Sequence, residues 1–137
     1  MKNLLKTIDF MRYLRQYLGD YLPENAFYSD VFNIDKEQAL AVYRSPNEER
    51  IGLNNIDPVT NAGFSIRIRW GKDTAKAEEN AFAIYEKIKE IEPGTNIGGH
   101  LVSCVLMGHK TGEPERVGMD DSGVIEYLIE VSIYYFK

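Results

Sequence analysis

The sequence has few of the residues that would build a disulfide scaffold or a histidine-rich metal site. Its 137 residues include one cysteine and two histidines. One cysteine cannot form a disulfide within the chain, so the fold must be held together by a hydrophobic core. This is compatible with a reducing compartment. With 44% hydrophobic residues, the chain can build such a core, and we expect a single domain over residues 1–137.

Long hydrophobic runs and an excess of basic residues are also missing. No stretch of about 18 residues is continuously apolar, so we expect no membrane-spanning helix. Lys6, Asp9, Arg12 and Arg15 interrupt the N-terminal segment, which therefore does not predict a signal peptide, and a cytosolic start is the default expectation. The net charge of −5 argues against a nucleic-acid-binding module, because such modules usually carry a basic surface.

The charge is unevenly distributed along the chain. Residues 1–72 contain ten Lys and Arg against nine Asp and Glu, a balance of +1. Residues 73–137 contain six against twelve, a balance of −6. Such asymmetry suits head-to-tail self-association, in which unlike surfaces meet, and it also arises by chance in chains of this size.

Hydrophobic periodicity and turn residues predict an alternating set of helices and strands. We expect helices at 3–18 and 74–92, the second capped by Asp73 or Thr74. We expect strands at 26–33, 38–44, 63–70, 100–108 and 124–136, with long loops at 45–61 and 109–123. This order predicts an α+β fold with a mainly antiparallel sheet of about four to five strands and two main helices packed on one face.

The last predicted strand has two different faces, because successive residues of a strand point to opposite sides. One face is entirely apolar or aromatic and consists of Ile125, Tyr127, Ile129, Val131, Ile133 and Tyr135. The opposite face mixes polar residues with Leu128, Tyr134 and Phe136. We expect the first face to pack on the helices. The second face is either covered by a partner or is an ordinary half-buried sheet surface with two exposed tyrosines.

The few reactive side chains do not form a recognisable catalytic or metal site. His100 and Cys104 are four residues apart, which along a strand is about 13 Å and too far for a nucleophile and its base. His109 lies past the end of that strand, and the spacing matches no common zinc pattern. We therefore expect Cys104 to be a small core residue. The glycines of GTNIGGH follow a helix and precede a strand, which predicts a turn rather than a phosphate-binding loop.

Two groups of charged residues allow more than one interpretation. Five acids lie in or near the second long loop: Glu113, Glu115, Asp120, Asp121 and Glu126. They lack the spacing of a calcium loop, so we interpret them as a solvated loop, with acid–base chemistry as the alternative. Arg67 and Arg69 alternate along the water-facing side of a predicted strand, where they either meet acidic groups of a partner or are simply surface residues. No catalytic residue, metal or cofactor is predicted.

The order of these elements, together with the glycines, Asp120 and the tyrosines between Gly118 and Tyr135, resembles the tail terminator proteins of long-tailed bacteriophages and prophages, also described as tail completion or minor capsid proteins. The last segment of that family similarly reads G-D-x-x-G-x-x-x-Y-x-x-x-x-x-x-Y-Y. The matching residues are Asp120, Gly123, Tyr127 and Tyr134-Tyr135, and Gly118 precedes Asp120 with Met119 between them. The resemblance implies a ring, commonly of six subunits, that caps the head-proximal end of the tail tube, ends tail growth and allows head–tail joining. It also implies no enzymatic activity, no cofactor and no membrane.

The resemblance further implies partners and interfaces. The expected partners are other copies of the chain, the tail tube protein and the head-side connector, with DNA passing through the lumen without specific binding. The expected locations are the tail or neck of the virion and, during assembly, the host cytoplasm. Seven residues are then candidates for subunit or partner interfaces: Arg67, Arg69, Asp120, Asp121, Leu128, Tyr134 and Phe136.

We expect the two arginines to pair with Asp120 or Asp121 of the next subunit, and the loops 45–61 and 109–123 to contact the tube and the connector. Three alternatives stay open. The chain is another neck or connector protein, a small-molecule binding domain that dimerises through its sheet, or a hydrolase or transferase that uses the acidic loop.

Overall fold

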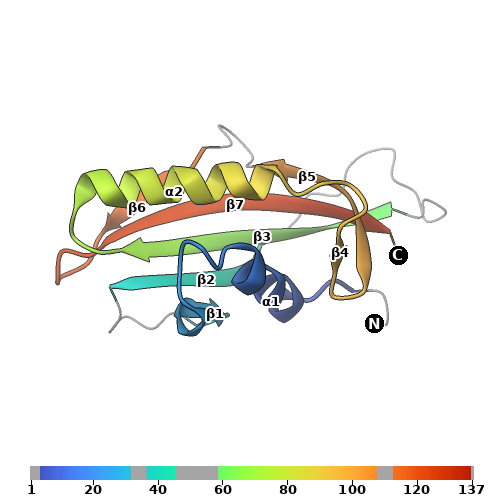
Figure 1. The fold of residues 1–137 in the computed structure, drawn as a ribbon, viewed down its shortest axis with the longest axis horizontal. Helices are drawn as coiled ribbons and strands as arrows, with labels where there is room; N and C mark the ends of the chain where they lie inside the picture. The colour runs from blue at the N-terminus through green and yellow to red at the C-terminus, as the bar shows by residue number, and fades with distance from the viewer. Residues whose placement is uncertain (1–3, 32–36, 46–58, 108–112, 137) are drawn as a thin grey trace.

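The computed structural model describes residues 4–31, 37–45, 59–107 and 113–136 (Figure 1). The elements in these ranges are α1 (Thr7–Tyr17), the 3₁₀ helix η1 (Glu24–Ala26), β1 (Phe27–Ser29), β2 (Gln38–Ser45), β3 (Val59–Trp70), α2 (Thr74–Lys89), β4 (Asn96–Ile97), β5 (His100–Met107), β6 (Glu115–Met119) and β7 (Ile125–Phe136). The strands form one seven-stranded sheet in the order β1-β2-β3-β7-β5-β4, and β6 also pairs with β7.

Strands β3 and β7 form the centre of the sheet and determine its length. Each is 12 residues long, and they pair antiparallel from Val59 opposite Phe136 to Arg69 opposite Glu126. On the other side of β7, strand β6 pairs with the beginning of β7 and β5 pairs with its end. Strands β5 and β6 therefore lie end to end along one edge of β7.

Both helices pack on the same face of the sheet. The odd-numbered residues of β7 point to this face and are buried from Ile125 to Tyr135. Helix α1 places Phe10 against Phe64 of β3, with ring centroids 4.8 Å apart. Helix α2 lies along β7 in Figure 1, and its Ala81 packs in a cluster with Ile125. The prediction that this face of the last strand packs on the helices is confirmed.

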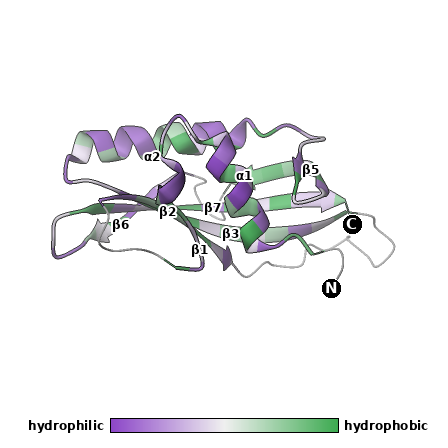
Figure 2. Cartoon of the chain, turned by 60° about the horizontal axis from the view of Figure 1, so that its bottom comes forward, coloured by the Kyte–Doolittle hydropathy of each residue, from purple (hydrophilic) through white to green (hydrophobic). Residues whose placement is uncertain are grey.

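The ends of the helices differ slightly from the predicted ranges. Helix α2 is capped as predicted, because the Asp73 side chain accepts hydrogen bonds from the backbone N–H groups of Ala75 and Lys76 at 3.1 and 3.2 Å. It ends at Lys89 rather than at residue 92. Helix α1 begins at Thr7, and both helices alternate hydrophilic and hydrophobic residues in Figure 2. Among the described residues, no helix is long and apolar enough to cross a bilayer.

The sheet is larger than the four to five strands predicted, and it is not antiparallel throughout. Strand β4 lies where a turn was predicted, and β6 lies inside the predicted loop 109–123. Strand β1 pairs in parallel with β2. The predicted strand 26–33 is shorter than expected, because its first residue belongs to η1 and β1 ends at Ser29 before Asp30, whose φ is 62°. Short edge strands carry too few alternating residues to be seen in the sequence.

Strand β3 begins four residues before its predicted start at Gly63. The residues Val59–Ala62 pair with the end of β7, so the length of the partner strand extends β3 into a segment that looks like a loop in the sequence. This corrects the end of the predicted loop 45–61. Its residues 46–58 lie outside the described ranges.

Candidate assembly surface

The second face of the sheet is covered by neither α1 nor α2, and we call it the helix-free face. It carries the odd-numbered residues of β3 and the even-numbered residues of β7, which are neighbours in the antiparallel register. Strand β5 adds Cys104 and Leu106, which lie opposite Tyr134 and Ser132 of β7. This face has a polar half near the beginning of β7 and an apolar half near its end.

In the polar half, side chains on neighbouring strands form hydrogen bonds with one another. Arg67 Nη2 donates to Glu126 Oε2 at 2.6 Å, an ion pair between β3 and β7. Ser65 Oγ donates to Glu130 Oε1 at 3.2 Å, and Ser45 Oγ of β2 donates to Glu130 Oε2 at 3.4 Å. The register explains these contacts, because Ser65 lies directly opposite Glu130 and Arg67 is diagonal to Glu126. Both glutamates therefore have partners within the chain.

The second arginine is buried. Arg69 is 3% exposed, and its Nη2 donates to Asp120 Oδ2 at 2.6 Å. Its register partner on β2 is Ala39, whose small side chain leaves room for the long arginine stem along the sheet. Asp120 Oδ1 accepts from the N–H groups of Ser122 and Val124 at 2.9 and 3.0 Å. The hydrogen bond from Arg69, with these backbone bonds, lowers the pKa of the Asp120 carboxyl.

The prediction that Arg69 faces water is wrong. The turn between β6 and β7 brings Asp120 back over the end of β3, although the two residues are 51 positions apart in the sequence. Alternation within one strand cannot reveal such a contact. Arg67 and Arg69 already have carboxylate partners within the chain, and Asp121 is exposed in the turn. Their pairing with acids of a neighbouring subunit stays a prediction.

The apolar half contains large side chains that the chain leaves exposed. Leu101, Leu106 and Phe136 are 49%, 40% and 43% exposed, and Cys104 is exposed among them. We call these four residues the apolar patch. Leu101 follows His100, whose ring contacts Tyr135 on the helix-covered side, so Leu101 points to the helix-free side. The patch spans β5 and the end of β7.

The residues predicted on the mixed face of the last strand differ in their exposure. Phe136 is 43% exposed, Leu128 is half-buried and Tyr134 is 7% exposed. The prediction that Cys104 is a core residue is wrong, because β5 lies near the sheet edge and Cys104 points to the helix-free face. His109 lies outside the described residues.

Leu101 and Leu106 were missed as candidate interface residues. Strand β5 is apolar at most positions, so the sequence does not show which of its side chains are buried. The glutamate partners of Arg67 and Ser65 could have been found by pairing the predicted strand 63–70 with the last strand in antiparallel register.

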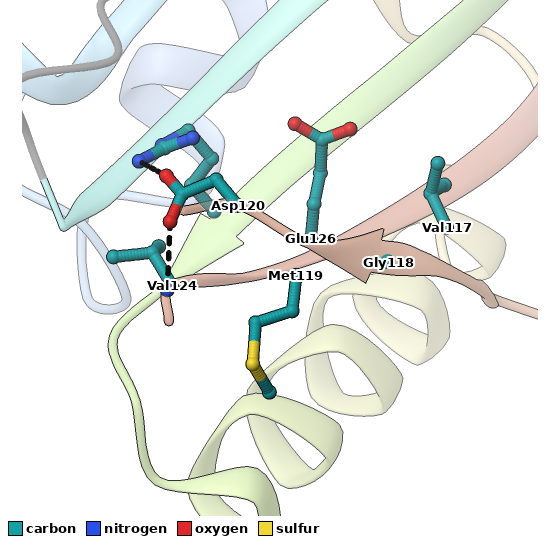
Figure 3. Close-up of a pocket in the computed structure, with 7 residues that line it drawn as sticks. Val117, Gly118, Met119, Asp120, Val124 and Glu126 are labelled. Carbon is teal, nitrogen blue, oxygen red and sulfur yellow. Dashed lines mark hydrogen bonds and ion pairs between the residues drawn. The ribbon is translucent and has the colours of Figure 1, made fainter. Parts of the chain in front are cut away.

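The structure offers little for ligand or metal chemistry in its described ranges. Within them, no group of three or more His, Cys, Asp or Glu residues could hold a metal ion. A cavity of about 220 Å³ lies beside β6 (Figure 3). Its charged lining groups are Arg69, Asp120 and Glu126, and these already form ion pairs within the chain. A ligand there would meet no set of converging polar groups, which a small-molecule site usually provides.

Comparison with known families places most of the chain in one of them. A family model described as "Bacteriophage tail terminator protein" matches residues 16–135. The match includes the end of α1, all of α2, strands β1 to β6 and nearly all of β7. A search of curated proteins found no matching sequence.

Proposed function

We propose, from the premise that this chain belongs to the bacteriophage tail terminator proteins, that copies of it form a ring on the head-proximal end of a phage tail tube. The ring ends growth of the tube and presents a surface to the head-side connector. We propose six copies, because rings in the family that the chain resembles commonly have six subunits. The role is structural and needs neither catalysis nor a cofactor.

The observation that carries this proposal, beside the family match, is the apolar patch. Contiguous large apolar side chains on a protein surface mark interaction sites, and protein interfaces place an apolar centre inside a polar rim. Here Leu101, Leu106 and Phe136 form the centre, and the hydrogen-bonded Glu130 lies on the same face of β7, two residues before the Ser132 that Leu106 faces. We propose that the patch is covered by a neighbouring subunit or by the tail tube protein.

The charge of the chain suits a channel through which DNA passes. Lys and Arg contacts to phosphate produce the nonspecific affinity that holds proteins on DNA. A chain with a net charge of −5 offers few such contacts, so DNA can slide through the lumen without binding. The proposed locations are the virion tail or neck and, during assembly, the host cytoplasm.

The test is a tube-capping experiment with variants of the apolar patch. Purified protein is added to growing tail tubes, and tube lengths and end-bound rings are measured by electron microscopy. Wild-type protein is expected to stop growth at one end, whereas Leu106→Asp and Phe136→Asp lose capping with their unfolding midpoints unchanged. Val31→Asp is the matched control, because Val31 is 62% exposed but lies outside the patch. Tyr134 is unsuitable because at 7% exposed it would report on folding.

The proposal fails if folded wild-type protein neither binds tube ends nor limits tube length. Binding to the head-side connector alone, without any effect on tubes, would favour the alternative of another neck protein. If both patch variants cap tubes as well as the wild-type protein does, the apolar patch is not needed for capping.

A further inference from the structure

We propose that neighbouring copies in the ring meet head to tail, with the outer side of α1 of one copy packed against the β6 edge of the next. The inference rests on the proposed ring and names the two unlike surfaces that the ring brings together. It concerns a contact distinct from the apolar patch, because β6 and the patch lie at opposite ends of β7.

The β6 edge combines open backbone groups with exposed apolar side chains. All five residues of β6 are exposed, with Val117 at 47% and Met119 at 53%. In the part of the chain that the structure describes, β6 pairs with β7 only. Figure 3 shows Val117 and Met119 pointing to opposite sides of the strand, so apolar groups flank the edge on both sides. Unpaired backbone groups on an edge strand offer contacts to another chain.

The shape of the edge favours a helix over another strand as the occupant. The register of β6 against β7 shifts between Arg116 and Gly118, and such a bulge interrupts the regular row of hydrogen-bonding groups that a pairing strand needs. The opposite edge strand of the sheet, β1, is only three residues long, which is too short to pair along the whole of β6 in a second copy. Side chains of a helix can instead fill the space beside Val117 and Met119.

The charges at this edge are mostly negative, and several of them have no ion-pair partner among the residues that the structure describes. Glu113, Glu115 and Asp121 are exposed, and none of them forms an ion pair with another described residue. The neighbouring Arg116 is the single cation of this segment, residues 113–121. A complementary partner must therefore bring positive charge.

The outer side of α1 has the complementary composition. Arg12 is exposed and Arg15 is partly exposed, and neither has a carboxylate partner among the residues that the structure describes. Tyr13 follows Arg12 on the helix and is stacked on Tyr17 with ring centroids 5.2 Å apart. Arg and Tyr are enriched in interfaces, and an aromatic ring is a favourable neighbour for the thioether of Met119.

The two surfaces cannot meet within one chain. The N–H of Leu5, just before α1, donates to the hydroxyl of Tyr135 near the end of β7 at 3.1 Å. Strand β6 pairs at the beginning of β7, from Ile125. Ten residues of strand, or about 33 Å, separate Tyr135 from Ile125. Helix α1 itself packs on β1 and β2, whereas β6 lies beyond β3 and β7 in the sheet order. A contact between α1 and β6 must therefore join two copies, and unlike surfaces that meet generate a ring when the rotation closes.

Cross-linking between two singly substituted proteins tests the contact. Cys104→Ser removes the native thiol, which is exposed in the apolar patch, so tube capping itself is judged on the wild-type protein. Arg12→Cys is placed in one protein of this background and Asp121→Cys in another. The two are treated with a short bismaleimide, separately and mixed, in solution and on tail tubes. We expect a cross-linked dimer in the mixture and none in either protein alone, and a ladder ending at the closed ring when both substitutions are in one chain.

Charge reversal gives a second, independent readout. Arg12→Glu is expected to raise the protein concentration for half-maximal assembly about tenfold, as loss of a close interfacial charge pair does. Asp121→Arg in the same chain is expected to restore it. Glu86→Arg on the outer side of α2 is the control and leaves that concentration unchanged, because it lies outside both surfaces.

The outcomes separate this inference from the proposed function. Tube capping without a mixed cross-link, or cross-links within either single variant alone, overturns the α1–β6 contact and leaves the terminator function standing. A mixed cross-link without tube capping supports the contact and overturns the function. Protein that stays monomeric both in solution and on tubes overturns both.

Discussion

The two faces of β7 differ in burial and in what covers them. Six residues of one face, from Ile125 to Tyr135, are buried under helices of the same chain. Residues of the other face range from ion-paired Glu126 to Phe136, which is 43% exposed. The comparison shows that folding uses one side of this strand and leaves the other side available for contacts with other chains.

The charged side chains at the centre of the helix-free face have partners within the chain before any other subunit arrives. Glu126 and Glu130 accept from side chains on β3, so neither carboxylate needs a second subunit for a hydrogen-bonding partner. The large side chains of the apolar patch, by contrast, are left exposed. The separation suggests that folding and assembly depend on different residues and can be broken separately.

The largest effect is expected from the helix-covered face. Phe64→Ala removes a fully buried ring that packs against Phe10, and is expected to lower the free energy of unfolding by about 3–5 kcal/mol. Phe136→Ala on the other face is the matched control, with an expected loss below about 1 kcal/mol. Denaturant titration followed by circular dichroism measures both. Similar losses for the two variants would mean that the two faces do not differ as described.

The next effect tests how closely the turn between β4 and β5 meets α1. Gly98 has a φ of 58°, and a Cβ there would lie 2.6 Å from the Cβ of Asp9. Gly98→Ala is therefore expected to cost about 1–3 kcal/mol through backbone strain and displacement of Asp9. Gly99→Ala is the control, because its φ of 87° is also positive but nothing lies within 4 Å. Equal thermal shifts in the two variants would show that the contact with Asp9 contributes nothing.

Much of the helix-covered face could be predicted from the sequence because it depends on local patterns. The periodicity of both helices, the Asp73 cap and the alternation of the last strand each lie within one segment, and the structure confirms the cap and the packing. The same alternation also placed Phe136 correctly on an exposed surface.

The helix-free face was harder to predict because its geometry depends on distant residues. The burial of Arg69 follows from its pairing with Asp120, which the β6–β7 turn supplies. The exposure of Cys104 follows from the place of β5 in the sheet rather than from its apolar neighbours. Strands β4 and β6 have two and five residues, too short for a periodic pattern. Sheet order and register are what the sequence does not show.

The Asp120 contact should make stability depend on pH. Its carboxyl has a folded-state pKa below the ordinary value of 3.8, so the carboxylate stabilises the fold at pH values above 3.8. This stabilisation is lost as pH falls below 3.8 and through the lowered folded-state pKa. Asp120→Asn should therefore be less stable than wild type at pH 7, with a difference that shrinks on acidification. Thermal unfolding from pH 7 to pH 2 measures it, and a difference that is constant with pH would contradict the assignment.

The smallest effect is expected for the ion pair of Arg67 and Glu126. It tests whether this pair contributes to folding alone or also to assembly. The guanidinium is 40% exposed, so a double-mutant cycle with Arg67→Ala and Glu126→Ala should give a coupling of only about 0.2–1 kcal/mol in the isolated subunit. The cycle is then repeated on the assembly equilibrium. If the pair serves folding alone, neither single variant changes assembly. The sequence led us to expect that Arg67 also meets an acid of the next subunit. In that case Arg67→Ala weakens assembly while Glu126→Ala does not. The arginine freed by Glu126→Ala remains available to the neighbouring subunit.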